Sequence, residues 1–417
     1  MKQKSNEKTI NNRLSKTNIA LMTTHGLNNI ISIFVGTFLV SYIYSISENY
    51  VLNVGLFYMS NYLVMGVVMY FVSVMIDRTN RVSLYRIAVL IRTVFIVIVL
   101  FTGRQLAGLV ILAGALYGIS EAFYWGSYNL MKNELVRRSL MPKFASYQKV
   151  MTKVGDFAIP LILGKIIDAD SFKSSAIIIL IVVILELIST MFIISQKPDG
   201  SSFDIKGFCR NVKGLGEKKY FVNTVLILTC FVGAVSAISV LNTIITMLTY
   251  GSNFSLGIFT SIFSVASLVY FVVISKFTKT GKRKVLFLIT AFVPMIASIV
   301  LMIYLNQITT AIFNGLYSIL SVTYDHTYDI HRNAVMKNFN MYDDIAEFQC
   351  TIEVIMEFVR AVIFGLMAII GALGAGFGSG GMIIALKVIL GVSVLAYVFA
   401  NFILMKYEDK LVENNLA

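Results

Sequence analysis

The chain has 417 residues, of which 57% are apolar and only 14% are charged. A water-soluble surface of this size needs about a quarter of its residues charged, so the composition excludes most soluble folds and predicts a polytopic membrane protein. The formal net charge of +13 would suggest a nucleic-acid partner in a soluble protein. Here we interpret it as lysine and arginine held on one side of a bilayer, and we expect no nucleic-acid partner.

Apolar segments long enough to cross a bilayer follow one another along the chain. A helix needs roughly 20 mainly apolar residues to cross the hydrocarbon core. We predict twelve transmembrane helices, near residues 22–45, 55–76, 82–102, 106–128, 147–167, 175–195, 221–248, 255–275, 285–304, 308–325, 346–371 and 381–405. Helices are expected because lipid offers the backbone no hydrogen-bond partner, and because no segment has the alternating pattern of a barrel strand.

Basic residues gather in alternate loops. One side has Arg78 and Arg81 in the loop after the second span and a basic segment at 196–220, whereas the loops of the other side hold only Arg104, Lys165 and Lys173. The positive-inside rule therefore predicts that both termini and the segment 196–220 are cytoplasmic. Abundant Ile, Lys and Asn favour a bacterial source, so we expect the cytoplasmic membrane of a bacterium.

An internal repeat with an offset of 200 residues divides the chain into halves. In 124-YWGSYNLMKNELV and 324-YDHTYDIHRNAVM, the first half's Tyr124, Tyr128 and Asn133 fall on Tyr324, Tyr328 and Asn333. We predict an all-α fold of two pseudo-symmetric six-helix bundles, 22–195 and 221–405, with a cytoplasmic tail at 1–21, a linker at 196–220 and a second tail at 406–417. Parallel repeats of this kind place a substrate site between two rocking bundles in one class of transporters.

Three motifs carry a family resemblance. They are 77-DRTNR-81 after the second span, a degenerate copy 280-TGKRK-284 after the eighth, and 121-EAFYWGSYN-129 at the end of the fourth. With these motifs the chain resembles the major facilitator superfamily over essentially its whole length, although Ser73 and Asn80 stand where the family's loop motif has glycine. The resemblance implies a transporter that carries out no chemical reaction and so is not an enzyme. It also implies that Asp77, Arg78 and Arg81 fasten the cytoplasmic ends of the bundles when the cavity faces outward; a plain topology signal is the alternative.

Two predicted spans carry charged residues in the membrane. The fifth has Lys153 and Asp156, and the eleventh has Glu353, Glu357 and Arg360. Spacings of three, four and seven residues place each set on one stripe of a helix. The repeat aligns Asp156 with Glu357, so we interpret both as pseudo-equivalent acids that face the seam between the bundles. Two roles stay open, an ion-pair gate and a proton or substrate site.

The predicted fourth span has an acid, Glu121, four residues before the only tryptophan, Trp125. An acid beside aromatic rings suits a cationic or amphipathic substrate, while an interfacial anchor is the other interpretation of Trp125. The resemblance places the first, fourth, seventh and tenth spans around the cavity. The candidate lining residues on these spans also include His25, Asn28, Tyr117, Asn242, Asn314, Tyr317 and Asp325. Arg92 and Glu186 are membrane-deep as well, and the sequence suggests no role for Glu186.

These features together predict a secondary active transporter that moves a small molecule by alternating access. Export of an amphipathic or drug-like compound and coupling to H⁺ or Na⁺ are the finer hypotheses, with membrane lipids as the surroundings. A ligand sensor on a transporter scaffold is the alternative. Three scattered cysteines and three histidines predict neither a metal site nor a cofactor, and we interpret the histidine-containing segment 325-DHTYDIH-331 as a cytoplasmic loop.

Overall fold

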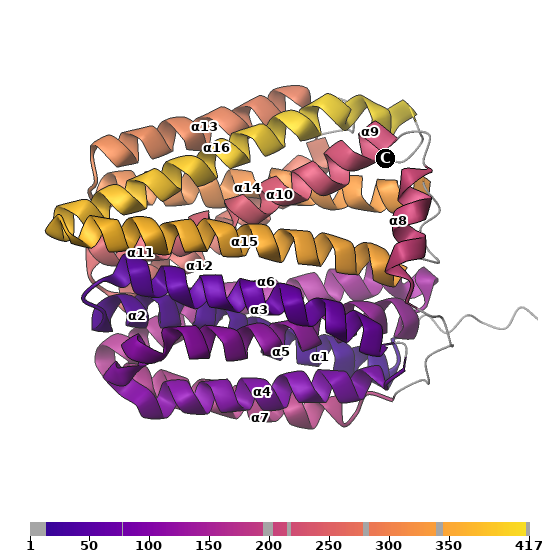
Figure 1. Ribbon diagram of the computed structural model, residues 1–417, viewed down its shortest axis with the longest axis horizontal. Coiled ribbons are helices and arrows are strands. Elements are labelled where there is room, and N and C mark those ends of the chain that lie inside the picture. Colours follow the sequence, from indigo (N-terminus) through magenta and orange to yellow (C-terminus); the bar gives the residue numbers. More distant parts are fainter. Residues whose placement is uncertain are drawn as a thin grey trace, which may run out of the picture.

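The computed structural model describes residues 14–76, 78–194, 203–214, 218–277, 283–338 and 345–413, and these residues form helices without any strand. The long helices lie roughly parallel to one another, and the short helix α8 (Ile205–Lys213) lies across one end of the bundle (Figure 1). We call this end the α8 end and the opposite one the distal end.

The first half contains six long helical stretches. They are α1 (Lys16–Ile33), which continues through a π-helical segment η1 (Phe34–Leu39) into α2 (Val40–Ile46), followed by α3 (Tyr50–Ile76), α4 (Arg81–Thr102), α5 (Leu106–Leu135), α6 (Met141–Ala169) and α7 (Phe172–Thr190). Local signals set the ends of several of these helices. The Asn80 side chain accepts a hydrogen bond from the Val82 backbone N–H at the start of α4. Helix α4 ends just before Gly103, whose φ of 53° favours glycine.

The second half contains six long stretches as well. They are a continuous stretch of α9 (Lys218–Phe221), the π-helical η4 (Val222–Ile227), α10 (Leu228–Val235) and α11 (Ala237–Tyr250), followed by α12 (Asn253–Phe277), α13 (Lys284–Ile303), α14 (Gln307–Asn338), α15 (Ile345–Ala375) and α16 (Gly378–Glu413). The turn between α11 and α12 contains Gly251, with a φ of 68°. The fold class predicted from the sequence is thereby confirmed.

Hydropathy alone recovers part of this arrangement. Within the described residues, nine helical stretches are long and apolar enough to cross a membrane, and one of these contains both α4 and α5. The charged α6 and the polar α14 are not among them. The predicted loop at 325–331 is wrong, because α14 continues to Asn338. A helix can extend beyond lipid with polar side chains, so the end of an apolar run need not be the end of the helix.

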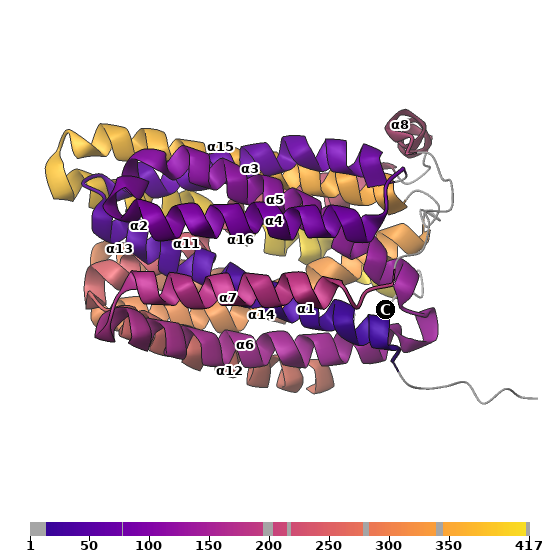
Figure 2. The same ribbon diagram turned by 90° about the horizontal axis from the view of Figure 1, so that it is seen from below.

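The two halves meet along two seams. Helix α3 packs along α15, and α6 packs along α12; both pairs are visible in Figure 2. Under the repeat, α3 in the first half corresponds to α12 in the second, and α6 corresponds to α15. The α3–α15 and α6–α12 seams are therefore equivalent. Glycine allows the close approach: a Cβ on Gly55 would lie 2.7 Å from the Ala368 backbone nitrogen, and one on Gly257 would lie 2.3 Å from the Pro160 carbonyl oxygen.

The repeat is also visible in the packing of buried tyrosines. Tyr124, Tyr128, Tyr324 and Tyr328 are all buried. In each half, one of these tyrosines contacts the first stretch, although the two are not equivalent under the repeat: the Tyr124 hydroxyl lies 2.5 Å from His25 Nδ1, and the Tyr328 hydroxyl lies 3.1 Å from Thr229 Oγ1. The outside of the bundle instead exposes large apolar side chains, including Leu90, Phe101, Ile181, Val269, Ile296 and Phe399. Such a surface is suited to lipid rather than to water.

Candidate functional site

Two adjoining cavities lie between the halves. The larger, which we call the seam cavity, has a volume of about 360 Å³ and is lined by residues of η1, α6, α11, α12 and α14. The smaller, the aromatic cavity, has a volume of about 220 Å³. Gly36 and Ser239 line both cavities, so one residue from each half marks where they meet.

The seam cavity is mostly polar on the side of the second half. Its lining there includes the candidates Asn242, Asn314 and Tyr317, together with Ser239, Thr243, Thr246, Ser264 and Ser267. The Asn314 side chain donates a hydrogen bond to Thr246 Oγ1 at 2.9 Å, which fixes its position. The first half contributes the charged residues Lys153 and Asp156. A small polar solute would therefore meet hydrogen-bonding groups from one half and an ion pair from the other.

The aromatic cavity has four aromatic rings in its lining, together with one acid, one base and smaller polar and apolar side chains. Its lining includes Tyr58, Tyr62, Tyr117, Glu121 and Trp125 from the first half and Arg360 from the second. The expected grouping of Tyr117, Glu121 and Trp125 around one space is thus present in the structure. Trp125 Nε1 donates a hydrogen bond to Glu121 Oε2 at 3.1 Å, so the indole is bound to the acid inside the protein.

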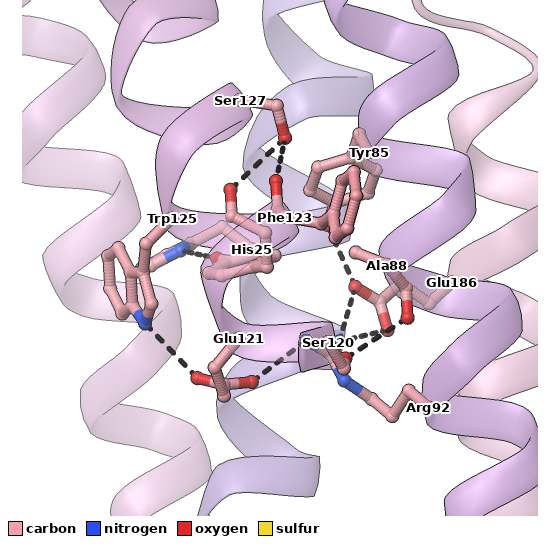
Figure 3. A network of polar contacts seen from close by, with 11 residues as sticks. His25, Tyr85, Ala88, Arg92, Ser120, Glu121, Phe123, Trp125, Ser127 and Glu186 are labelled. Carbon is pink, nitrogen blue, oxygen red and sulfur yellow. Dashed lines mark hydrogen bonds and ion pairs between the residues drawn. The ribbon is translucent and has the colours of Figure 1, made fainter. Parts of the chain in front are cut away.

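Glu121 belongs to a buried cluster of three charged residues (Figure 3). Arg92 on α4 donates from Nη2 to Glu121 Oε1 at 2.9 Å, and from Nη1 to the two carboxylate oxygens of Glu186 at 3.0 and 2.9 Å. Arg92 and Glu186 are fully buried, and Glu121 is 8% exposed. Burying isolated charges in a membrane is costly, so the ion pairs explain how three separate helices can hold them.

Aromatic and polar neighbours surround this cluster. The Tyr85 hydroxyl donates to Glu186 Oε1 at 2.8 Å, and the Arg92 guanidinium lies 5.2 Å from the centre of the Tyr124 ring. His25 contacts the Tyr124 hydroxyl and stacks on Tyr128 at 4.6 Å between ring centres. His25 therefore lies behind the cluster and is not among the residues lining the two cavities.

The two acids aligned by the repeat are each paired on their own helix. Asp156 accepts from Lys153 Nζ at 2.9 Å, and Glu357 accepts from Arg360 Nη1 at 2.6 Å. Asn29 also donates to Asp156, at 3.0 Å. Both pairs have the spacing i, i+3, and both lie at an interface between the halves, one in the seam cavity and the other on the α15 side of the α3–α15 seam.

Other candidates lie outside the two cavities. Asn28 is buried, and Asp325 is exposed on α14 beyond Tyr317; neither lines either cavity. Glu353 lines a separate space of about 20 Å³ with Trp125 and Cys350. Asp77 lies outside the described residues. Arg78 is exposed, and Arg81 forms an ion pair with Glu134 on α5, within the same half. The role of these three residues in fastening the bundles stays a prediction.

A contact between the halves that the sequence did not predict closes the distal end. Asp168, at the end of α6, accepts hydrogen bonds from Ser252 Oγ at 2.7 Å, from the backbone N–H groups of Asn253 and Phe254 at 3.1 and 2.8 Å, and from Asn253 Nδ2 at 3.0 Å. It thus caps α12 across the seam. We call these contacts the distal clasp. Partial burial raises the pKa of the Asp168 carboxyl, but the hydrogen bonds outweigh this, and its pKa lies below the ordinary value.

Sequence reasoning missed the partners of Glu121. Arg92 and Glu186 are recognisable in the sequence as charged residues within apolar segments. Their position at a similar depth in the bilayer to Glu121 is the signal that could have indicated the contact. Tyr58, Tyr62 and Gly36, which also line the cavities, carry no distinctive signal in the sequence. Among the described residues, no group of three or more His, Cys, Asp or Glu side chains could hold a metal ion.

The fold and the cavities define a helical membrane protein of the transporter type, built from two equivalent six-helix halves with a polar space between them. The family model of the Major Facilitator Superfamily matches residues 18–379, and the chain belongs to this family. The family assigned from the sequence motifs is confirmed.

Comparison with individual proteins adds little detail. The chain is 22% identical over 147 residues to an uncharacterized protein of Bacillus subtilis (strain 168), YqgE, and this match covers 35% of the chain and 34% of that protein. In overall fold it is similar to a bacterial homologue of the iron transporter ferroportin in an inward-facing state, with a TM-score of 0.66, 11% identity and coverage of 94% and 98% of the two chains. It is also similar to a D-xylose-proton symporter, with a TM-score of 0.65, 14% identity and coverage of 92% and 96%.

Proposed function

We propose that this protein is a secondary active transporter that moves a small molecule by alternating access. The observation that carries the proposal is the pair of adjoining cavities lined by polar and charged residues of both halves. A space shared by two equivalent bundles can open to either side when the bundles rock. Membership of the family supports membrane transport in general, and the finer assignment rests on the cavities.

The lining suggests a small amphipathic solute. Hydrogen-bonding side chains of α11, α12 and α14 face the seam cavity, while aromatic rings of α3 and α5 face the aromatic cavity. A molecule with a polar part and an apolar part could occupy both. Export of an amphipathic or drug-like compound is one form of this proposal. Coupling to H⁺ or Na⁺ is a further part of this proposal. The carboxyl groups of Glu121 and Asp156 are the candidates for binding the coupling ion.

The experiment is counterflow in proteoliposomes that contain the purified full-length chain. Vesicles are loaded with an unlabelled solute, and uptake of the same labelled solute is followed for a panel of nucleosides, sugars and amphipathic amines. We expect a transient overshoot of labelled solute with at least one class of solute. Exchange through a central site produces this overshoot whatever the physiological direction of transport or the coupling ion. Repeating the assay under an imposed H⁺ or Na⁺ gradient then tests coupling.

The variant Asn314→Leu provides the site-specific check. Asn314 lines the seam cavity and hydrogen-bonds to Thr246, so an apolar side chain should reduce counterflow several-fold. Leu316→Met, on the same helix, should leave counterflow unchanged, because Leu316 does not line this cavity. Binding without flux for every solute on the panel would contradict transport and favour the ligand sensor.

A further inference from the structure

The cluster around Glu121 carries an uneven number of charges. Arg92 is its single base, and Glu121 and Glu186 are both bonded to it. With the three groups in their ordinary ionised forms, the cluster has one net negative charge. The two other ion pairs near the cavities, Lys153 with Asp156 and Arg360 with Glu357, each balance one to one.

The geometry indicates which of the two acids holds the unbalanced charge. Both carboxylate oxygens of Glu186 accept from Arg92 Nη1, and Glu186 Oε1 also accepts from the Tyr85 hydroxyl. Glu121 receives one guanidinium hydrogen bond, and its other hydrogen bonds come from neutral groups, the Trp125 N–H and the Tyr117 hydroxyl. Glu186 is fully buried, whereas Glu121 lines the aromatic cavity. The charge that Arg92 does not neutralise therefore faces the cavity.

The surroundings of Glu121 fit a particular chemical group. The rings of Tyr58, Tyr62, Tyr117 and Trp125 line the same space. Faces of aromatic rings attract cations, and an attached apolar group can pack on them. Arg360 also lines this space, but its charge is matched by Glu357 at 2.6 Å, and its guanidinium lies 5.2 Å from the Tyr62 ring centre.

We propose that the aromatic cavity is a binding site for an organic monocation, with the cationic group beside Glu121 and its apolar part against the rings. This inference rests on the proposed function and specifies its substrate class. A zwitterion held between Glu121 and Arg360 is the rival ligand, and it is less favoured because its carboxylate would have to compete with Glu357 for the guanidinium. A proton that neutralises the cluster is the rival occupant, and it would remove any preference for cations.

Trp125 makes the proposal directly measurable. It is the only tryptophan of the chain, and it is hydrogen-bonded to the carboxylate in question. Selectively excited tryptophan fluorescence of the purified full-length protein therefore reports on the surroundings of Glu121. Four probes that share a phenyl ring and differ in charge are titrated: benzyltrimethylammonium, benzyl alcohol, benzoate and zwitterionic phenylalanine.

We expect a saturable fluorescence change with benzyltrimethylammonium, at a dissociation constant about tenfold or more below that of benzyl alcohol. The preference should come from the attraction of the cation to the Glu121 carboxylate and to the ring faces. Benzoate should bind more weakly still. The variant Glu121→Gln should abolish the preference for the cation while benzyl alcohol still binds. Because Arg92 stays paired with Glu186 in that variant, folding should be retained. Glu121→Asp should keep the preference with reduced affinity.

Two further variants separate charge from contact. Glu186→Gln removes the unbalanced charge without touching the cavity, so it should also lower the preference for the cation. Glu48→Gln makes the same chemical change in an exposed turn that is distant in sequence from Glu121 and Glu186. This variant should leave the preference for the cation intact. Equal affinity for cation and neutral probe, tighter binding of phenylalanine or benzoate, or an unaltered preference in Glu121→Gln would each overturn the inference.

The two proposals fail in different ways. Counterflow of a neutral or anionic solute, together with no selective cation binding, would reject the monocation site and leave transport intact. Selective cation binding with no flux for any solute would reject transport and leave the site.

Discussion

At the scale of single residues, Arg92 holds together the charged interior of the first half. It connects α4 with Glu121 on α5 and Glu186 on α7, and all three side chains are buried. Removing one partner of a buried ion pair leaves the other charge without compensation, which costs more than the pair itself contributes. The residues of the cluster should therefore differ in how much stability their loss removes.

We predict that Arg92→Met destabilises the protein by about 3–5 kcal/mol, because it leaves two buried carboxylates without a base. Glu186→Gln should cost clearly less, since Arg92 keeps its bond to Glu121. The measurement is helix loss on heating in detergent, followed by circular dichroism. Arg104→Met, at an exposed position, is the matched control and should melt like the unaltered protein. Equal melting of the Arg92 and Arg104 variants would refute the structural role of the cluster.

At the scale of secondary-structure elements, the distal clasp joins α6 to the start of α12. Its acceptor, Asp168, satisfies backbone N–H groups that have no partner within α12. A negative charge there is also favoured by the helix dipole. Since α6 and α12 belong to different halves, the clasp must break whenever the halves separate at the distal end.

We predict that Asp168→Ala shifts the protein toward states with a separated distal end. Spin labels at Lys165 and Ser255, placed on a background in which Cys209, Cys230 and Cys350 are serine, report the distance between α6 and α12. The distribution should broaden to longer distances in the variant. Asp170→Ala is the matched control, because Asp170 accepts from Ser174 of the same half, and it should leave the distribution unchanged.

The clasp should also respond to acid in the unaltered protein. The pKa of Asp168 is lowered in the closed state, so the stabilisation is complete above the ordinary aspartate pKa of about 3.9 and is lost as the pH falls through the lowered value. We expect no change in the distance near neutral pH and separation only in strong acid. Separation between pH 6 and 8 would contradict this assignment.

At the scale of the whole molecule, the distribution of basic residues predicts the orientation in the membrane. Arg210, Arg283 and Lys284 are on segments at the α8 end of the bundle, while Arg104 follows α4 at the distal end. We propose that the α8 end is cytoplasmic, as the positive-inside rule predicts, and that the chain divides at the basic linker 196–220 into the halves 22–195 and 221–405.

Reporter fusions test this orientation. Fusions of green fluorescent protein and alkaline phosphatase after residues 104, 210 and 285 should give fluorescence at 210 and 285, and phosphatase activity only at 104. Opposite locations for 210 and 285 would contradict both the orientation and the division into halves.

The helix boundaries show how far local sequence determines the fold. The spans around 55–76 and 82–102 agree closely with α3 and α4, because apolar length and the Asn80 and Gly103 signals act within a few residues of the helix ends. The predicted segments 308–325 and 381–405 are too short, since α14 and α16 continue to Asn338 and Glu413. Hydropathy records only where lipid requires an apolar surface, and it is silent about polar helix beyond the lipid.

The sequence by itself determined the helical membrane class, the two-fold repeat, the family and the presence of acids within the spans, because each of these follows from composition, periodicity and spacing along one chain. The sequence also predicted that Tyr117, Glu121 and Trp125 lie close together, since they share one helix. Only the tertiary structure decided that Arg92 and Glu186 neutralise Glu121 in part, that Asp168 caps α12, and that the cavity joins η1 to α11. These contacts link residues that are 29 to 94 positions apart in the cluster alone, and their partners are selected by helix packing rather than by any local pattern.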